Sequence, residues 1–120
     1  MLALAIAPSA ASAQSDFTEF YYNAGVNAHF YYSPRSVSAN GALRDLAWTD
    51  SNMQHANHDT ERLVFHAQLN CSAQTIQNLY VERFSSSSGQ SIGTVDLRGQ
   101  SPVDPYRAGT MGGYLAAKVC

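Results

Sequence analysis

Charged side chains are scarce in this chain: Asp, Glu, Lys and Arg make up 13% of its 120 residues, about half of the usual share. The formal net charge is −2. A nucleic-acid-binding domain needs a basic face to neutralise phosphates, and an anionic membrane surface attracts the same kind of face. The composition therefore argues against both classes of partner.

Long apolar runs are missing as well, and no segment approaches the roughly 20 apolar residues that a membrane-spanning helix needs. Residues 1–13 read MLALAIAPSAASA, a short apolar run followed by small residues that end in the A-x-A pattern of a signal-peptide cleavage site. The Lys or Arg that normally opens a signal peptide is missing. We expect residues 1–13 to be a signal peptide without its first residues. Residues 14–120 should then form one soluble, exported domain without stable membrane insertion.

Cysteine is equally rare, and Cys71 and Cys120 are the only two in the sequence. An even number of cysteines behind an export signal favours a disulfide in an oxidising compartment, either the periplasm or the cell surface. A bond between them would close a loop of about 50 residues, which stabilises the folded state by roughly 4 kcal/mol in the chain-entropy model. The alternative is a pair of unpaired, buried thiols.

The first half of the mature chain has the patterns of β-strands. Aromatic-rich segments at 17–24 and 29–32 favour strands, and Pro34 then interrupts regular pairing. Asn40-Gly41 is a strong turn signal, because both residues tolerate positive φ. A further strand is predicted over 42–50, with Leu46 and Trp48 on one face.

The clearest periodicity runs from Leu63 to Cys71. Apolar and mostly polar positions alternate there over nine residues: Leu63, Phe65, Ala67, Leu69 and Cys71 against Val64, His66, Gln68 and Asn70. This pattern predicts a half-buried strand with Cys71 on its apolar face. Strands are also predicted over 75–84 and 91–97, on either side of a flexible polar loop at 85–89.

The C-terminal residues change to a helical pattern. Thr110 is a candidate N-cap, and the apolar residues Met111, Leu115 and Val119 are spaced to share one helix face. Gly112 and Gly113 weaken the first turn. Because so short a helix is marginal in isolation, a disulfide at Cys120 would hold it against the sheet.

Several of these segments, taken in order, resemble one bacterial family. They are Tyr31-Tyr32-Ser33-Pro34-Arg35-Ser36-Val37, Asn40-Gly41, the strand through Trp48, the strand ending in Cys71, and Gly112-Gly113-Tyr114-Leu115-Ala116-Ala117-Lys118-Val119-Cys120. Together they look like the surface-adhesin protein E family, whose domain ends in a similar short helix. The resemblance covers residues 17–120.

The resemblance implies an α+β fold, in which a single antiparallel sheet is backed by the short C-terminal helix and Cys71 is bonded to Cys120. It also implies adhesion, since the protein that gives the family its name is a surface lipoprotein that binds host matrix and plasma proteins and can dimerise. This chain has no lipidation cysteine after residue 13 and no basic cluster. We expect an exported, non-enzymatic, adhesin-like domain that binds host or envelope proteins. A homodimer through an exposed sheet edge is a further option.

A metal site is the main rival hypothesis. His55, His58 and Asp59 offer two imidazoles and a carboxylate within five residues, and zinc or copper uses such ligands. His66 or Glu61 would have to complete the site. This alternative describes a periplasmic metal-binding or small-ligand-binding protein that uses the loop around His55 and His58. The simpler interpretation is a polar loop between two strands.

Enzymatic chemistry has little support in the sequence. No G-x-S-x-G nucleophile setting is present, and the run of serines at 85–88 falls in a loop. Asp59 and Glu61 could act as paired carboxylates only if the fold brought them together. We therefore expect no enzyme, no catalytic residues and no cofactor.

Two tyrosine pairs, at 21–22 and 31–32, offer a last candidate site. Exposed aromatic side chains are enriched at interfaces, so the four rings could form a binding platform. In the alternative, one tyrosine of each pair packs inward and its neighbour faces solvent, as alternation along a strand requires.

Overall fold

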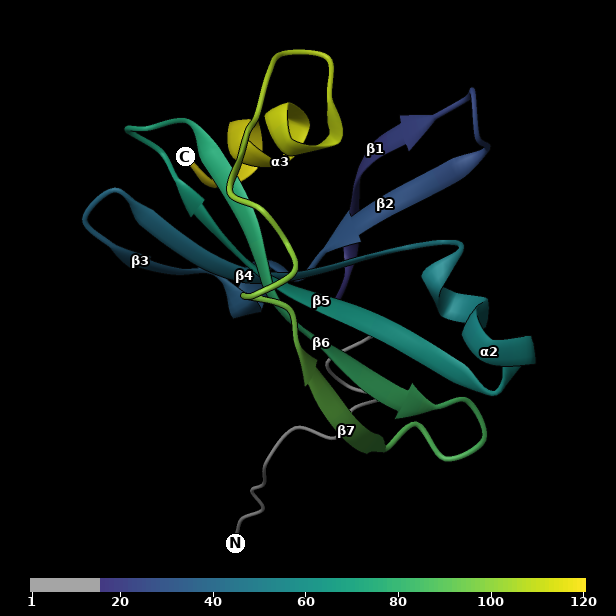
Figure 1. Ribbon diagram of the computed structural model, residues 1–120. Coiled ribbons are helices and arrows are strands. Elements are labelled where there is room, and N and C mark those ends of the chain that lie inside the picture. The colour runs from purple at the N-terminus through teal and green to yellow at the C-terminus, as the bar shows by residue number, and fades with distance from the viewer. Residues whose placement is uncertain (1–15) are drawn as a thin grey trace, which may run out of the picture.

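The computed structural model describes residues 16–120, and the predicted signal peptide at 1–13 lies outside the described residues. Within them, eight strands form one antiparallel sheet, and a short helix follows at the C-terminus (Figure 1). Cys71 and Cys120 form a disulfide. The predicted fold class, α+β with one sheet, a C-terminal helix and one disulfide, is therefore confirmed.

The elements follow one another in the order of a meander with small interruptions. The strands are β1 Thr18–Asn23, β2 Ala28–Tyr32, β3 Ser38–Asn40, β4 Leu43–Asp50, β5 Glu61–Asn70, β6 Thr75–Ser85, β7 Ser91–Asp96 and β8 Asp104–Pro105. The helical elements are the 3₁₀ turns η2 Pro34–Ser36 and η3 Met53–His55, and the helices α2 Ala56–Asp59 and α3 Met111–Val119. The sheet order is β1-β2-β4-β5-β6-β7, with β3 beside β4 and β8 beside β6.

Two predicted chain breaks shape the edge beside β4. Pro34 opens η2, which separates β2 from β3, so these two strands pair with different halves of β4. Gly41 has a φ of 61°, the left-handed conformation expected of a tight turn, and joins β3 to β4. Both predictions are confirmed.

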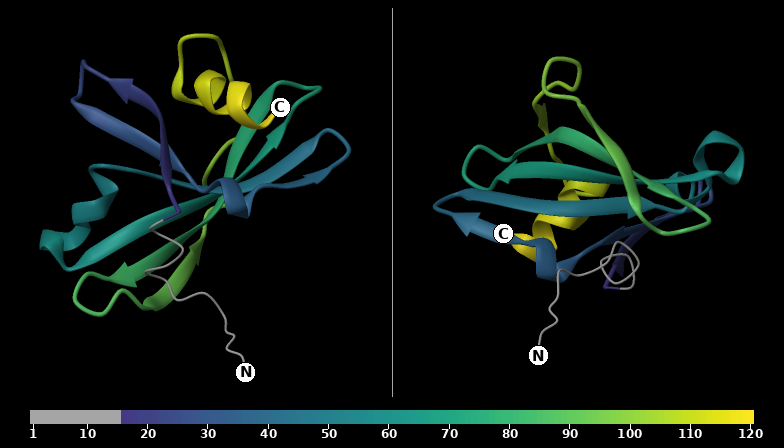
Figure 2. Two further views of the ribbon diagram at one scale, coloured as in Figure 1. Left: turned by 180° about the vertical axis from the view of Figure 1, so that it is seen from behind. Right: turned by 90° about the horizontal axis from the view of Figure 1, so that it is seen from below.

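The main core lies between the sheet and α3. Leu115 is fully buried, and it packs with Phe20, Leu46, Trp48, Ala67, Leu69 and Ala116. Met111 and Val119 join the same cluster, which confirms the predicted helix face. Figures 1 and 2 show α3 lying between the β1–β2 hairpin on one side and the adjoining ends of β5 and β6 on the other. We call the side of the sheet that contacts α3 the helix face, and the opposite side the outer face.

Three contacts fix the ends of α3. Thr110 is the predicted N-cap, and its Oγ1 accepts a hydrogen bond from the Gly113 N–H at 3.2 Å. At the other end, Arg44 Nε donates to the Val119 carbonyl at 3.0 Å. The disulfide then ties Cys120 to Cys71, across a Cα–Cα distance of 5.7 Å.

The outer face is less open than the alternation in β5 predicted. Val64 falls on the polar side of the sequence pattern, yet its side chain is only 4% exposed. It packs with Ala47 and Phe84 in a second cluster, against which Phe17 also packs. A register shift between His66 and Ala67 divides the strand as well. The second cluster forms because the segment before β1 brings Phe17 onto this face, a non-local contact that period-two reasoning does not contain.

Candidate binding face

The β1–β2 hairpin presents four candidate side chains on the outer face. Its register places Glu19 opposite Tyr31 and Tyr22 opposite His29, and directly paired residues share one side of a sheet. A bulge between Glu19 and Tyr21 accommodates Phe20 as the extra residue. Aromatic side chains of β1 and β2 therefore point to both faces.

The positions of the two tyrosine pairs relative to the sheet depend on this bulge. On the helix face, Tyr21 stacks on Tyr114 of α3 at a centroid distance of 4.7 Å, and Tyr32 packs edge-on against Phe20 at 5.8 Å. Tyr22, by contrast, is 44% exposed. One tyrosine of each pair thus packs against the helix face, and the four rings do not form a single platform. Tyr22 and Tyr31 remain as candidates on the outer face.

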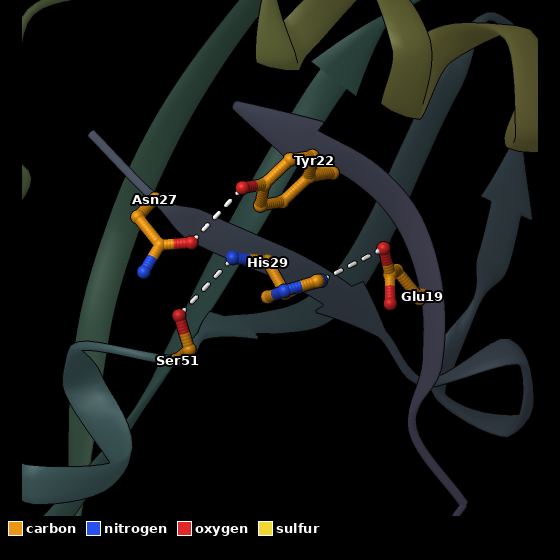
Figure 3. Close-up of polar contacts among 5 residues, drawn as sticks. All are labelled: Glu19, Tyr22, Asn27, His29 and Ser51. Atoms are coloured by element: carbon orange, nitrogen blue, oxygen red, sulfur yellow. Dashed lines mark hydrogen bonds and ion pairs between the residues drawn. The ribbon is translucent and has the colours of Figure 1, made fainter. Parts of the chain in front are cut away.

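A chain of polar contacts crosses this hairpin (Figure 3). His29 Nδ1 lies 3.1 Å from Glu19 Oε2, and the His29 ring packs on Tyr22 at a centroid distance of 4.4 Å. The Tyr22 hydroxyl donates to Asn27 Oδ1 at 2.9 Å. Because Glu19 and His29 are each almost half exposed, their contact is a surface interaction that is screened by solvent.

Ser51 is hydrogen-bonded to the main chain of His29 and not to the His29 imidazole. Its Oγ accepts a hydrogen bond from the backbone N–H of His29 at 3.1 Å, while the His29 ring is directed to Glu19 (Figure 3). A serine nucleophile requires its hydroxyl to be hydrogen-bonded to a base. In the structure the Ser51 hydroxyl is not hydrogen-bonded to the His29 imidazole.

A pocket of about 370 Å³ adjoins these side chains on the outer face. It is lined by Phe17, Tyr31, Thr49, Ser51, Gln54 and His55. These residues come from the segment before β1, from β2, from the end of β4 and from η3. Its volume lies within the range of about 300–1,000 Å³ that is typical of small-molecule sites.

Hydrogen bonds hold the pocket in shape. Thr49 is only 4% exposed, and its hydroxyl donates to the Leu63 carbonyl at 2.7 Å and accepts from Gln54 Nε2 at 2.8 Å. The neighbouring Asp50 is also buried, and one carboxylate oxygen accepts the N–H groups of Asn52 and Met53, each at 2.9 Å. These contacts fix η3, which carries Gln54 and His55, against the end of β4.

Of the proposed metal ligands, the structure shows only His55 and Asp59 in contact. His55 Nδ1 pairs with Asp59 Oδ1 at 3.2 Å, and both side chains are more than 70% exposed. His66 instead contacts Glu82 at 3.2 Å. Among residues 16–120, no group of three or more His, Cys, Asp or Glu side chains could hold a metal ion. In place of a site, Asn57, His58 and Asp59 have left-handed φ values of 51°, 61° and 67° and form a tight turn.

The candidate carboxylate pair is also separated. Glu61 receives two hydrogen bonds from Arg83, at 2.7 and 2.9 Å, whereas Asp59 pairs with His55. The hydrogen bond from Arg83, with a smaller contribution from Asn57, lowers the pKa of Glu61 to about 2. A carboxyl group with so low a pKa does not serve as a general acid near neutral pH.

Sequence reasoning missed most of the pocket. Phe17, Tyr31 and Thr49 fell within predicted strands and His55 was assigned to a possible metal loop, but none of them was predicted to line a pocket, and Gln54 was given no role. One sequence feature that indicates the role of Thr49 is the polar run Thr49-Asp50-Ser51, which follows the apolar residues Leu46-Ala47-Trp48. The convergence of the pocket residues depends on the pairing of Tyr31 with Thr49 between β2 and β4.

A second polar cluster lies further along the outer face. The rings of His66 and Tyr80 stack at a centroid distance of 4.3 Å, and Glu82 pairs with His66. Partial burial, together with the nearby carboxylates of Glu82 and Asp45, raises the pKa of the Tyr80 hydroxyl. Tyr80 therefore stays neutral at physiological pH.

Comparisons with protein-family models, with curated proteins and with solved structures found no match for this chain. None of the helices in the described part of the chain has the length and apolar character to cross a membrane.

Proposed function

We propose that this chain is an exported, non-enzymatic domain of the cell envelope that binds a partner through the outer face of its β1–β2 hairpin. The observation that carries the proposal is the grouping of Tyr22, His29 and Tyr31 beside a pocket on one face of the sheet. Aromatic side chains with polar tips are enriched where proteins bind one another. The Cys71–Cys120 disulfide supports the exported location, since such bonds persist in oxidising compartments.

The resemblance to the surface-adhesin protein E family supports the same function. It would make host matrix and plasma proteins, or other envelope proteins, the partners of this domain. The signal peptide at 1–13 belongs to the proposal as well, and the adhesin-like role requires that the exported domain reach the cell surface.

Location is the first test. The chain, preceded by a complete signal peptide, is expressed in a diderm bacterium, and intact cells are treated with an external protease or with antibody. Accessible protein would support the adhesin-like role, and immobilised matrix and plasma proteins would then be screened for binding. Protein that is protected until the outer membrane is opened would contradict adhesion and restrict the partners to the periplasm.

Two variants at exposed side chains test the face. We expect Tyr22→Ala to weaken partner binding and Val103→Ala to leave it unchanged, because Val103 is 57% exposed but lies outside the β1–β2 hairpin. Equal losses in the two variants would contradict the assignment of binding to the outer face.

A second candidate function is small-ligand binding in the periplasm. His55 lines the pocket of about 370 Å³, and this observation favours a small organic ligand over a metal ion for the loop around His55 and His58. Metal analysis of the purified protein separates the two versions: stoichiometric metal that is lost in His58→Ala would restore the metal hypothesis.

A homodimer through a sheet edge is the remaining proposal. All six residues of β7 are exposed, including Ile92 and Val95, and no strand in residues 16–120 pairs with its outer edge. The strand contains neither the Lys nor the Pro with which proteins usually protect an edge. Light scattering on the wild type and on Val95→Lys tests the dimer, and a monomeric wild type would contradict it.

A further inference from the structure

The pocket on the outer face keeps several hydrogen-bonding groups free. Gln54 donates one N–H of its side-chain amide to Thr49 Oγ1. Its carbonyl Oε1 has no hydrogen-bond partner among residues 16–120. Ser51 Oγ accepts from the His29 backbone and keeps its own O–H to donate. The Tyr31 hydroxyl likewise makes no hydrogen bond within the described residues. The pocket therefore offers an acceptor, a donor and a group that can do both.

The same pocket has two aromatic rings and no formally charged lining residue. Phe17 and Tyr31 contribute the rings, and none of the six lining residues is Lys, Arg, Asp or Glu. The imidazole of His55 is engaged by Asp59, so it does not supply an unopposed positive charge. An anionic ligand would find no matching cation here. A purely apolar ligand would leave the Gln54 carbonyl oxygen without a partner, which is costly when the group is desolvated.

We propose that this pocket binds a neutral sugar residue, such as a hexose unit of a glycan. A sugar ring has an apolar face of C–H groups that packs on an aromatic ring, and hydroxyls that both donate and accept. Tyr31 and Phe17 provide the aromatic surface, while Gln54 Oε1 and the Ser51 hydroxyl bind the sugar hydroxyls. A pocket at the lower end of the small-molecule range fits one ring better than a long ligand. The inference rests on the proposed binding function of the outer face and names the chemical class of its ligand.

Hydrogen bonds within the chain hold the pocket residues in place, which favours binding. Thr49 is buried and hydrogen-bonded on both sides, and Asp50 fixes the start of η3. Little conformational entropy is therefore lost at the protein when a sugar enters. For one exposed sugar ring we expect dissociation constants in roughly the millimolar range, about 4 kcal/mol of binding free energy.

Saturation-transfer NMR on the full chain is the first experiment. The probes are the methyl glycosides of glucose, galactose, mannose and N-acetylglucosamine, with N-acetylneuraminic acid, inorganic phosphate and adenosine as comparisons. We expect transfer to the ring protons of at least one neutral glycoside, and amide shifts at Ser51 and Gln54 in the same titration. No transfer to any neutral glycoside, stronger binding of the acid, phosphate or adenosine, or shifts confined to another region would overturn the proposal.

Variants then localise the site. Tyr31→Ala and Gln54→Ala should each weaken glycoside binding by about tenfold or more, which corresponds to about 1.4 kcal/mol. Tyr114→Ala, at an exposed ring on α3, should leave it unchanged. Tyr31→Phe retains the ring and removes only the hydroxyl, so we expect a smaller loss of glycoside binding than in Tyr31→Ala. It replaces Tyr31→Ala as the test variant if Tyr31→Ala does not fold. Undiminished binding in the folded Tyr31 and Gln54 variants would also overturn the proposal.

Different results would contradict the sugar site and the adhesin-like function. If the domain binds immobilised matrix proteins but neither free glycosides nor prior enzymatic removal of their glycans reduces that binding, the sugar site is wrong and the protein-binding face stands. If glycosides bind in the pocket but no matrix, plasma or envelope protein is bound, the sugar site stands and the adhesin-like function is wrong.

Discussion

Arg44 in β4 lies with its Nε 3.0 Å from the carbonyl oxygen of Val119, at the C-terminal end of α3. The last carbonyls of a helix have no partner within it and carry partial negative charge, so a guanidinium there is favourable. Arg44 also donates to the carbonyls of Gly41 and Leu43, at 2.7 and 3.0 Å. One side chain thus joins the β3–β4 turn to the helix. This attachment is separate from the disulfide between Cys71 and Cys120.

Replacing Arg44 tests this second attachment. Arg44→Met keeps most of the aliphatic stem and removes the donors, so we expect a loss of about 1 kcal/mol in the free energy of unfolding. Urea unfolding followed by circular dichroism measures it. Arg98→Met is the matched control, because Arg98 pairs with Asp96 in an exposed turn and is two-thirds exposed. An equal, small effect in both variants would show that Arg44 does not hold α3.

The disulfide should contribute more than any single hydrogen bond. Cys71 and Cys120 are separated by 49 residues, and closing a loop of about this length stabilises by roughly 4 kcal/mol in the chain-entropy model. We expect Cys120→Ser to lower the melting temperature by about 10 °C or more under non-reducing conditions. A reductant should lower the wild type to the same temperature and leave the variant unchanged. An unchanged melting temperature in Cys120→Ser would contradict the bond.

Combining the two changes reports on their coupling. Arg44 and the disulfide hold the same end of α3 against the sheet. When one of them is removed, the other should contribute more to the free energy of unfolding. We expect the double variant Arg44→Met, Cys120→Ser to lose more stability than the sum of the single losses. Strict additivity would mean that α3 stays docked through Leu115 and its neighbours alone.

Gly113 gives a prediction that opposes helix propensity. Alanine is favoured over glycine inside a helix by about 1 kcal/mol, so propensity alone would make Gly113→Ala stabilising. A Cβ at this position, however, would overlap the Arg107 carbonyl oxygen, where the chain passes close to the start of α3. We expect Gly113→Ala to lower the melting temperature, since overpacking typically costs about 1–3 kcal/mol. Ala117→Gly, at an exposed position of the same helix, measures the propensity effect by itself, and a stabilised Gly113→Ala would contradict the predicted overlap.

Local sequence signals predicted most of the strands and the C-terminal helix, whereas their assembly into one sheet was expected from the family resemblance. The Asn40-Gly41 turn and the Thr110 cap each depend on a few neighbouring residues, and both are confirmed. The alternation before Cys71 predicted the strand β5, but not the burial of Val64 or the register shift within the strand. Gly112 and Gly113 had been interpreted only as weaknesses of the helix. Their actual role, to admit the chain at Tyr106 and Arg107, depends on tertiary contacts that propensity does not include.

The candidate site was much less predictable. The bulge after Glu19 sends Phe20 and Tyr21 to the same face, and strict alternation would have separated them. The pocket unites Phe17, Tyr31 and Gln54 from separate segments, and only the pairing of the strands brings them together. The candidate metal ligands show the complementary effect: His55 and Glu61 are close in sequence, yet His55 contacts Asp59 and Glu61 is hydrogen-bonded to Arg83.

Acid stability provides the last prediction, through Glu61 and Arg83. This ion pair joins β5 to β6, and the Glu61 side chain is only 12% exposed. Hydrogen bonding by Arg83 lowers the pKa of Glu61 from 4.5 to about 2. Because the folded-state pKa is below the unfolded one, the pair stabilises the protein above pH 4.5, and that stabilisation is lost as the pH falls from 4.5 towards 2.

Glu61→Gln removes this proton-linked contribution. We expect the variant to melt below the wild type at neutral pH, and the difference between them to shrink as the pH approaches 2. Thermal melts at closely spaced pH values measure it. Asp96→Asn is the matched control: the pKa of Asp96 is also lowered to about 2, by Arg98, but this pair spans only two residues in an exposed turn. Its hydrogen bonds can form locally in the unfolded chain, so the pH-dependent difference should be smaller than for Glu61. A constant difference between the wild type and Glu61→Gln across this range would mean that the ion pair does not link the two strands.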